Sequence, residues 1–267
     1  MSHPVRKRFG QHFLHDAHVI QRIAEAIDLK HNDHVIEIGP GLGALTLPLL
    51  ERYPYQQYLA LEIDRDAIKS LSNATQKHTD FFIQEADALR TDFAALLPEA
   101  ENIRLIGNLP YNISTPLIFH LINFKHRIID MHFMLQKEVV DRMVAMPGSK
   151  TYGRLSVMVQ AHWNAEKLFE VGPGAFKPPP KVDSAIICLT PKSISHANEY
   201  HIKDPAIFAD VVRQAFSQRR KTIRNSLKSF LSPENFDQLG LDPQLRAERL
   251  SVLDFISISN YLSSKNQ

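Results

Sequence analysis

The sequence predicts an α/β domain built on a mostly parallel sheet, followed by a small all-α domain. From residue 34 onward, short apolar runs alternate with segments of helical periodicity, which is typical of successive βαβ units. After about residue 190 the strand-like runs stop, and helical segments are separated by turns at Ser232-Pro233 and Asp242-Pro243. We therefore expect a first domain over residues 1–192 and a helical domain over residues 193–267.

Short strands separated by helices predict a parallel sheet that is covered on both faces. The expected strands are Val35–Ile38, Tyr58–Leu61, Phe81–Ile83, Arg104–Ile106, Met131–Leu135 and Ala185–Leu189. The expected helices between them include Leu45–Glu51, Ala67–Asn73 and Ser114–Asn123. The stretch from Pro191 to His196 has the composition of a linker between the two domains.

Composition limits the class of protein. Hydrophobic residues make up 44% of the 267 residues, which is enough for a substantial core, and no run is long and apolar enough to cross a membrane. The N-terminus is basic but has no apolar segment behind it, so we expect no secretory signal. The single cysteine, Cys188, excludes an intrachain disulfide and lies in an expected strand, where packing is its expected role. These observations favour a cytoplasmic protein.

The distribution of charge is more informative than the net charge of +2, which by itself does not predict nucleic-acid binding. Residues 211–231 contain six basic side chains and no acidic one. On one continuous helix, four of them would form a stripe beside an apolar stripe. Those four are Arg213, Arg220, Arg224 and Lys228. The pattern predicts an RNA-binding face, with a merely solvated basic face as the alternative; the same choice applies to the cluster Arg6-Lys7-Arg8.

A glycine-rich turn follows the first expected strand, in Glu37-Ile38-Gly39-Pro40-Gly41-Leu42-Gly43. Glycines there let the backbone turn sharply and approach a ligand in front of a helix N-terminus. Dinucleotide-binding and S-adenosylmethionine-binding folds both use such a turn. Glu62 ends the second expected strand, where a carboxylate can bind the hydroxyls of a ribose. The alternative for Glu62 is a capping or solvated carboxylate.

Two further features favour S-adenosylmethionine over a nicotinamide cofactor. Asp87 follows the third expected strand, where a carboxylate can accept a hydrogen bond from an adenine amino group. The glycine turn contains Pro40 but no Arg or Lys that could neutralise a diphosphate. We therefore expect a methyltransferase rather than an oxidoreductase, and no metal ion.

The tetrapeptide Asn108-Leu109-Pro110-Tyr111 follows the apolar run that forms the fourth expected strand. The amide oxygen of Asn108 can accept a hydrogen bond from an exocyclic amine, and the ring of Tyr111 can stack on a base. Pro110 fixes its own φ and favours an extended Leu109, so that backbone carbonyls can point into a site. These residues predict a site for an adenine amine, with a strand-ending turn as the alternative.

Taken together and in this order, the motifs resemble those of the ribosomal RNA adenine N6-dimethyltransferases, over nearly the whole chain. The segments that carry the resemblance are Phe9–Leu14, Glu37–Thr46, Glu62, Asp87, Asn108–Tyr111, Phe176–Val182 and Phe216–Thr222. Within this family the chain is most similar to the bacterial small-subunit enzymes, which dimethylate two adjacent adenosines in the hairpin near the 3′ end of 16S rRNA. The resemblance implies a Rossmann-like S-adenosylmethionine-dependent domain followed by a helical RNA-binding domain.

The resemblance also implies roles for particular residues. Glu62 would hold the ribose of S-adenosylmethionine, Asp87 its adenine amine, and Gly39 would contact it through the backbone. Asn108 would lie where donor and target base meet, with Leu109 and Pro110 beside it. The other donor-binding residues would be His12, Leu14, Gly41, Ile63 and Ala88. Many members have Asn where this chain has His12, which makes the role of that residue pH-sensitive.

For the RNA, the resemblance implies that Tyr111 and Phe176 stack on the target base. The expected RNA-binding side chains are Arg6, Lys7, Arg8, Arg219, Arg220, Lys221 and Arg224. The expected partner is 16S rRNA in the small (30S) ribosomal subunit, bound by a monomer. The alternatives are a large-subunit rRNA methyltransferase of the macrolide-resistance type, a DNA adenine methyltransferase, and a mainly non-catalytic assembly factor.

Overall fold

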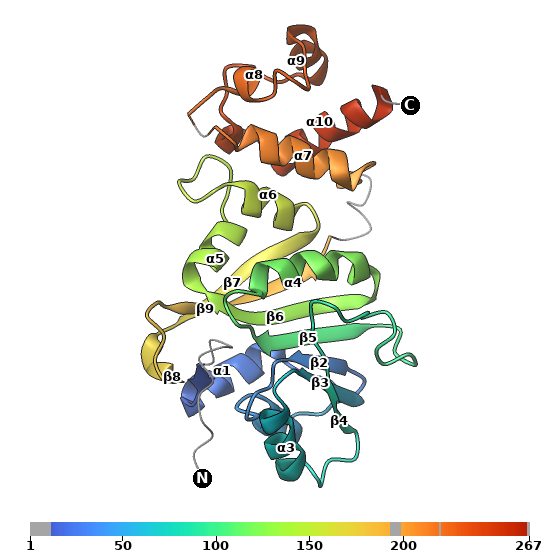
Figure 1. Cartoon of the computed structure of the whole chain (residues 1–267), viewed down its shortest axis with the longest axis vertical. Helices are drawn as coiled ribbons and strands as arrows, with labels where there is room; N and C mark the ends of the chain where they lie inside the picture. Colours follow the sequence, from blue (N-terminus) through green and yellow to red (C-terminus); the bar gives the residue numbers. More distant parts are fainter. Residues whose placement is uncertain (1–11, 193–198, 219, 266–267) are drawn as a thin grey trace. The chain divides into compact units, whose positions relative to one another are not determined.

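The computed structural model describes residues 12–192, 199–218 and 220–265 (Figure 1). The chain forms two compact units. Unit 1 consists of the described residues up to Val140 together with Glu166–Pro191. Unit 2 consists of Asp141–Ala165 and the described residues from Lys192 onward. No helix among the described residues is long and apolar enough to span a membrane.

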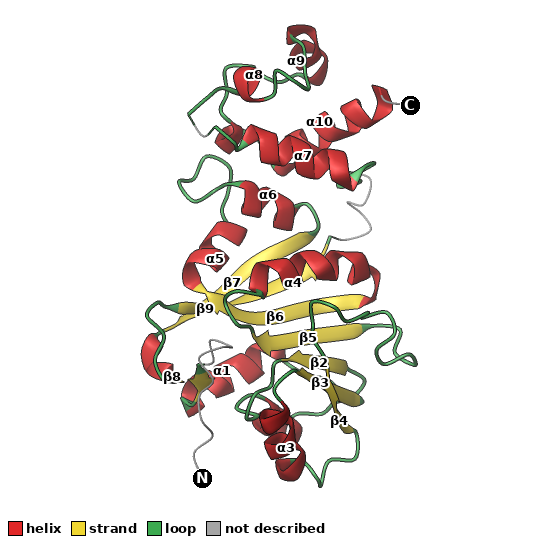
Figure 2. Cartoon of the chain, viewed as in Figure 1, coloured by secondary structure: helices red, strands yellow, loops and turns green. Residues whose placement is uncertain are grey.

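A 7-stranded sheet with the order β4-β3-β2-β5-β6-β9-β7 forms the centre of the fold (Figure 2). The strands are β2 (His34–Ile38), β3 (Gln57–Glu62), β4 (Phe81–Glu85), β5 (Ile103–Asn108), β6 (Ile128–Gln136), β7 (Trp163–Val171) and β9 (Ser184–Pro191). The pairs β2–β3, β2–β5, β3–β4 and β5–β6 are parallel, whereas β6–β9 is antiparallel. All six expected strands are present, and β7 was not anticipated.

Helices cover both faces of this sheet in unit 1 (Figure 1). On one face, α1 (Ala17–Ile27), α2 (Thr46–Arg52) and α3 (Arg65–Ala74) bury apolar side chains against alternate strand residues. On the other face, α4 (Ser114–Leu121) contributes a fully buried apolar side. The expected doubly covered, mostly parallel sheet is thereby confirmed, together with the three expected helices.

Local sequence signals fix where the helices of unit 1 begin. The side chain of Asp16 accepts hydrogen bonds from the backbone N–H groups of His18 and Val19, which caps α1. The side chain of Asp64 caps α3 in the same way, by accepting a hydrogen bond from the backbone N–H of Asp66. Such caps satisfy backbone donors that the helix leaves unpaired. Because Asp64 comes two residues after Glu62, the start of α3 fixes the chain immediately behind the carboxyl end of β3.

A second, 2-stranded sheet pairs β1 (Phe13–Leu14) with β8 (Phe176–Lys177). In this antiparallel pair Leu14 lies opposite Phe176, and His15 N–H donates to Ala175 O at 2.9 Å. Two segments more than 160 residues apart are thereby joined beside α1. Both Leu14 and Phe176 are buried in the core that α1 and α2 cover.

Unit 2 has a helical core of its own. Its helices include α6 (Arg154–Gln160), α7 (Pro205–Ala215), α8 (Ile223–Ser226), α9 (Pro233–Leu239) and α10 (Val252–Lys265). Buried apolar residues of α6, α7 and α10 pack together in one cluster. The predicted helical C-terminal region is present.

The observed units differ from the predicted division after residue 192 in one respect. Residues 141–165, which were expected in the first domain, belong to unit 2. Tyr152 and Val157 pack in the helical cluster, and the Tyr152 hydroxyl donates to Leu250 O at 3.0 Å. These contacts join residues about 100 positions apart, so no local pattern indicated them.

The prediction of one continuous basic helix over residues 211–231 is wrong. Helix α7 ends at Ala215, and Ser217 Oγ donates to Gln214 O, a bond that competes with helix continuation. Thr222 is extended and forms a β-bridge with Arg246, after which the short helix α8 begins. Consequently Arg213 does not share a helical stripe with Arg224, and it pairs instead with Asp210 at 2.9 Å.

Candidate active site

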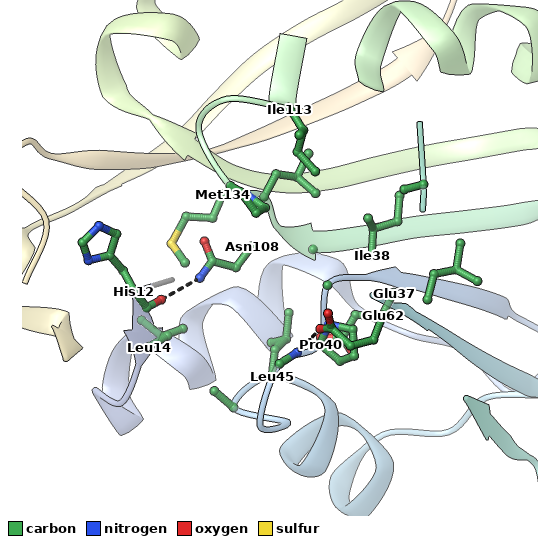
Figure 3. Close-up of a pocket in the computed structure, with 18 of the residues that line it drawn as sticks. His12, Leu14, Glu37, Ile38, Pro40, Leu45, Glu62, Asn108, Ile113 and Met134 are labelled. Carbon is green, nitrogen blue, oxygen red and sulfur yellow. Dashed lines mark hydrogen bonds between the residues drawn. The ribbon is translucent and has the colours of Figure 1, made fainter. Parts of the chain in front are cut away.

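A cavity of about 300 Å³ lies in unit 1, where the parallel strands β2, β3 and β5 end (Figure 3). Ligands of open α/β sheets characteristically bind at this edge. All the donor-binding and catalytic residues expected from the sequence line it. The lining includes Gly39, Gly41, Glu62, Ile63, Asp87, Ala88, Asn108, Leu109, Pro110, Tyr111, His12, Leu14 and Phe176.

The glycine turn after β2 requires glycine at several positions. Gly39, Gly41 and Gly43 have φ values of +69°, +56° and +85°, which L side chains rarely adopt. A Cβ at Gly43 would lie 2.7 Å from Leu71 Cδ1, so this glycine also allows α3 to pack closely. At Gly39 nothing lies within 4 Å of an added Cβ, because this position faces the open cavity.

The carboxylate of Glu62 joins the ends of β2 and β3. Its side chain is only 7% exposed. Oε2 accepts from Gly41 N–H at 3.0 Å, and Oε1 accepts from Ile63 N–H at 2.8 Å and Asp64 N–H at 2.9 Å. Three backbone donors therefore fix the carboxylate at the cavity edge, where it is held rigidly rather than solvated.

Asp87 and Ala88 lie in the turn after β4. Asp87 Oδ1 accepts from Leu89 N–H at 3.0 Å, and Thr91 Oγ1 donates to the Asp87 carbonyl at 2.9 Å. The other carboxylate oxygen is 3.7 Å from Arg90 Nε, in an exposed ion pair. Ala88 is buried. This turn therefore presents one carboxylate next to an apolar surface.

The tetrapeptide that follows β5 faces the cavity. Asn108, the last residue of β5, donates from Nδ2 to His12 O at 3.4 Å (Figure 3). Within the described part of the chain, Oδ1 of Asn108 accepts no hydrogen bond, so an acceptor remains available. Leu109 is buried, and its N–H donates to Met134 O at 3.2 Å, which ties the turn to β6. The amide is thus held on one side and open on the other.

Tyr111 and His12 form part of the cavity wall together. Their rings are stacked with centroids 6.2 Å apart and planes 29° apart. The Tyr111 hydroxyl pairs with Ser184 Oγ at 3.1 Å, and His12 Nδ1 pairs with Pro178 O at 2.9 Å. Phe176 also lines the cavity, but its side chain is 3% exposed and packs mainly in the core.

Several cavity residues were not among the predicted site residues, including Glu37, Gly107, His132 and Met134. Glu37 is 2% exposed, and its Oε2 accepts from Thr46 Oγ1 and Tyr58 OH, both at 2.6 Å. Burial raises the pKa of Glu37 to about 7, although the two hydrogen bonds favour the carboxylate. Glu37 precedes the glycine turn, so the motif itself was the available signal. His132 and Met134 are brought to the cavity by strand register alone.

None of the predicted RNA-binding residues that the structure describes belongs to the lining of this cavity. Arg220, Lys221 and Arg224 are exposed in unit 2, around the turn between α7 and α8. The Thr222–Arg246 bridge places Arg246, which the sequence did not suggest, beside this turn. Arg6, Lys7, Arg8 and Arg219 lie outside the described residues.

Comparison with known proteins decides the family. The model of the family described as ribosomal RNA adenine dimethylase matches residues 2–264. The chain belongs to this family. It is 52% identical over 263 residues to ribosomal RNA small subunit methyltransferase A of Thiobacillus denitrificans, covering 98% of this chain and 100% of that protein. The protein of the same name from Pseudomonas aeruginosa is 51% identical over 263 residues, covering 98% and 96%.

Solved structures agree with this assignment. A dimethyladenosine transferase from Plasmodium falciparum superimposes with a TM-score of 0.81 at 26% identity, covering 96% of this chain and 98% of that chain. The 23S rRNA methyltransferase ErmE superimposes with a TM-score of 0.72 at 25% identity, covering 94% of this chain and 99% of that chain. The predicted Rossmann-like methyltransferase fold is confirmed, and the dimethylase is an rRNA-modifying enzyme with S-adenosylmethionine as methyl donor.

The cavity of the dimethylase fits this donor chemically. Its described lining contains the carboxylates of Glu37, Glu62 and Asp87 and no Lys or Arg. Carboxylates favour a cationic sulfonium and accept hydrogen bonds from hydroxyl and amino groups. Apolar side chains such as Leu14, Leu45 and Ile63 complete the wall. A binding site for a diphosphate would need positive charge or free backbone donors, and the Gly41 N–H is already occupied by Glu62.

Proposed function

We propose that this dimethylase transfers methyl groups to N6 of two adjacent adenosines in the hairpin loop near the 3′ end of 16S rRNA. It would act as a monomer on the small (30S) ribosomal subunit, in the cytoplasm, with a role in subunit biogenesis. The observation that carries this proposal is the identity of about half of all residues, over essentially the whole chain, with small-subunit methyltransferase A proteins. The geometry of the cavity supports it at the level of chemistry.

S-adenosylmethionine supplies an electrophilic methyl group on a positively charged sulfur. We assign its ribose to Glu62 and its adenine amine to Asp87, since each presents a carboxylate at the carboxyl end of a strand. Gly39 offers backbone on the open side of the glycine turn. His12 and Leu14 would contact the methionine part from the β1 side of the cavity. The remaining contacts would come from Gly41, Ile63 and Ala88.

The target amine needs help because the N6 lone pair of adenine is delocalised into the ring. Asn108 Oδ1 is free to accept one N6 hydrogen, and the carbonyl of Leu109 or Pro110 can accept the other. Two such bonds favour a tetrahedral nitrogen whose lone pair points at the methyl carbon. The C–N bond forms as the C–S bond breaks, and the proton leaves afterwards to solvent. Catalysis then rests on positioning and on fixed dipoles rather than on a general base.

The base itself must be unstacked from the RNA before it can reach this site. Tyr111 offers a ring that is partly exposed to the cavity and already fixed by His12 and Ser184. Phe176 would contribute the part of its ring that faces the cavity. In unit 2, the exposed side chains of Arg220, Lys221 and Arg224 would bind RNA phosphates, with Arg246 beside them.

The test is methylation of unmethylated 30S subunits with labelled S-adenosylmethionine, followed by mass-spectrometric mapping of the methyl groups. Wild-type protein should place them on the two adjacent adenosines. Asn108→Ala should lower turnover on the order of 10²-fold because the N6 contact is lost, whereas donor binding should weaken far less, since the other described hydrogen bond it removes is the long one to His12 O at 3.4 Å. Asn123→Ala is the matched control, because this exposed amide donates to His120 O and does not line the described cavity. Near-normal turnover of Asn108→Ala would contradict the assigned role.

Two alternatives have distinct outcomes in the same assay. The likeness to the 23S rRNA methyltransferase ErmE makes large-subunit RNA a competing substrate, and labelling of 23S rather than 16S rRNA would establish it. If the main role were in assembly, a catalytically inactive protein that still binds RNA would restore normal growth and subunit profiles to a deletion strain.

A further inference from the structure

Asp87, the residue assigned above to the adenine amine of the donor, lies in a long loop. Residues 86–102 connect β4 to β5 and contain neither helix nor strand (Figure 1). Loops longer than about 12–15 residues without secondary structure are uncommon in compact domains, because ordering them costs backbone entropy. The conformation of this β4–β5 loop therefore depends on contacts from neighbouring elements.

One guanidinium holds the second half of the β4–β5 loop. Arg127 is the last residue of the 3₁₀ helix η2 (Ile122–Arg127), directly before β6. Its two terminal nitrogens donate to five loop carbonyl oxygens, four of them at 2.7–3.1 Å. The carbonyls belong to Phe93, Ala94, Leu96, Leu97 and Ala100. Leu97 has a φ of +46°, which non-glycine residues rarely adopt, so Arg127 supports a turn that is unfavourable by itself.

A histidine of α4 holds the half of the loop that contains Asp87. His120 Nε2 lies 2.8 Å from Thr91 O. A carbonyl oxygen can only accept, so Nε2 carries the proton and donates it to this bond. Thr91 Oγ1 in turn donates to Asp87 O at 2.9 Å. The His120 ring packs edge-on against the rings of Phe93 and Phe124, with centroids 6.0 and 5.2 Å away. Two successive hydrogen bonds thus connect α4 to the backbone of Asp87.

The segment that provides both contacts begins at the other side of the proposed reaction. Helix α4 starts at Ser114, whose Oγ donates to Tyr111 O at 3.2 Å. The same segment continues through η2 and ends with Arg127. Neither His120 nor Arg127 belongs to the described lining of the cavity. Their effect on a ligand can therefore be exerted only through the loop that they hold.

We propose that His120 and Arg127 are positioning residues that make the donor site selective for the 6-amino group of adenine. This inference rests on the proposed assignment of that amine to Asp87. The Asp87 side chain is 40% exposed, so its position depends on the loop backbone rather than on burial. A carboxylate attracts an amino group and repels a carbonyl oxygen, but it discriminates strongly between them only where it cannot turn away.

The test uses two ligands that differ at this edge of the purine. S-adenosylhomocysteine has an amino group at position 6, and S-inosylhomocysteine has a carbonyl oxygen there. Both are titrated calorimetrically into wild-type protein, His120→Phe and Arg127→Met. Wild-type protein should bind S-adenosylhomocysteine roughly 10–100-fold more tightly, as expected for a hydrogen bond to a charged group. In both variants this ratio should fall to within about threefold, because the loop no longer fixes Asp87.

Two further variants separate positioning from general stability. His120→Phe keeps a ring against Phe93 and Phe124 and loses only the N–H, whereas His120→Gln retains an N–H that can reach Thr91 O. His120→Gln should therefore keep the wild-type ratio. Lys125→Met, at an exposed residue of η2, is the matched control for Arg127→Met and should also keep it. If His120→Phe and Arg127→Met weaken both ligands equally, the role is merely structural and the proposal is overturned.

Asp87→Ala distinguishes this inference from the assignment on which it rests. If Asp87→Ala keeps the wild-type ratio, the adenine assignment is wrong and the inference fails with it. If Asp87→Ala loses the ratio while His120→Phe and Arg127→Met keep it, only the positioning role is overturned. Should Arg127→Met fail to fold, an equal ratio in wild type and His120→Phe would still overturn the proposal. These titrations need no RNA, so an error in the 16S assignment would leave the ratios unchanged.

Discussion

A Cβ at Gly107 would lie 2.5 Å from the carbonyl oxygen of Ile38, closer than real Cβ contacts allow. Gly107 is on β5 and Ile38 ends the neighbouring strand β2, so the two ends can approach closely only because position 107 has no side chain. This approach brings Asn108 and the glycine turn into the wall of one cavity. A single absent methyl group therefore sets the spacing between the proposed donor site and the proposed target-amine site.

Gly107→Ala is expected to force β5 away from β2. We expect the free energy of unfolding to fall by about 1–3 kcal/mol, as for other overpacked sites, and methylation to fall further than stability. Gly172→Ala is the control, because an added Cβ there meets nothing within 4 Å. Urea unfolding and the methylation assay measure the two effects. Equal behaviour of the two variants would show that the sheet tolerates the contact.

Glu37→Gln is expected to remove a pH dependence of stability. Burial raises the folded-state pKa of Glu37 from 4.5 to about 7, so the folded protein retains a proton that the unfolded chain loses. The resulting stabilisation is complete below pH 4.5 and disappears as the pH rises through 7. Its magnitude is on the order of 3 kcal/mol.

The difference in free energy of unfolding between wild type and Glu37→Gln should therefore change between pH 4.5 and 7. As the pH rises, the variant should become more stable relative to wild type. Urea denaturation across this range measures the difference. Glu51→Gln, at an exposed carboxylate near Lys77, should run parallel to wild type. Parallel curves for Glu37→Gln as well would mean that Glu37 titrates normally.

Arg104 is expected to be the most costly ion-pair residue of unit 1 to remove. It contacts the carboxylates of Asp130 and Asp33 and donates to Ile27 O at 2.6 Å, at the end of α1. Arg104→Met would leave the buried carboxylate of Asp130 and the partly buried one of Asp33 without this cation, at a cost to the free energy of unfolding of about 3–5 kcal/mol. Arg65→Ala removes an exposed pair with Glu85 and should cost under about 1 kcal/mol. A similar loss in both variants, measured by urea denaturation, would refute a structural role for the buried network.

Tyr111→Phe and Tyr111→Ala are expected to distinguish the contribution of the Tyr111 ring to methylation from that of its hydroxyl. Among the described residues the hydroxyl pairs with Ser184 alone, so Tyr111→Phe and Ser184→Ala should each keep methylation within about fivefold of wild type. Tyr111→Ala removes the proposed stacking surface and should weaken binding of the target base by about 1–3 kcal/mol. Steady-state methylation of small subunits, with kcat and KM determined separately, distinguishes the variants. A strong loss of methylation in Tyr111→Phe would mean that the hydroxyl, rather than the ring, makes the main contribution of Tyr111.

The polar site residues Glu62, Asp87 and Asn108 could be identified from their place at or just after an expected strand, whereas His12, Leu14 and Phe176 were identified only through the motif resemblance. Glu62, Asp87 and Asn108 end strands or follow them, and parallel strands bring their carboxyl ends to the same edge. Motif order was therefore enough to group them in one cavity. His132 has no such signal, because it is a polar residue inside a strand and reaches the cavity only through the register of β6 against its neighbours.

The less predictable features all depend on contacts between distant segments. Phe176 is fixed by pairing with Leu14, and residues 141–165 join unit 2 through side chains such as Tyr152. The break after Ala215 likewise depends on Thr222 pairing with Arg246. Periodicity in a short window is compatible with a continuous helix over 211–231, and the break becomes apparent only from the pairing of Thr222 with the distant Arg246.

Because the helix ends at Ala215, the arginines of residues 211–231 are expected to differ in their contribution to RNA binding. Arg220 and Arg224 flank Thr222 and are exposed, whereas Arg213 is paired with Asp210 on α7. Arg220→Glu combined with Arg224→Glu should weaken binding to 30S subunits and make it less dependent on salt. Each lost phosphate contact should reduce the slope of log K against log salt by about 0.7–0.9. Arg213→Ala should leave that slope nearly unchanged, since its charge is already offset locally. Filter binding over a range of salt concentrations gives both slopes. An unaltered slope in the double variant would mean that these arginines are solvated and do not contact RNA.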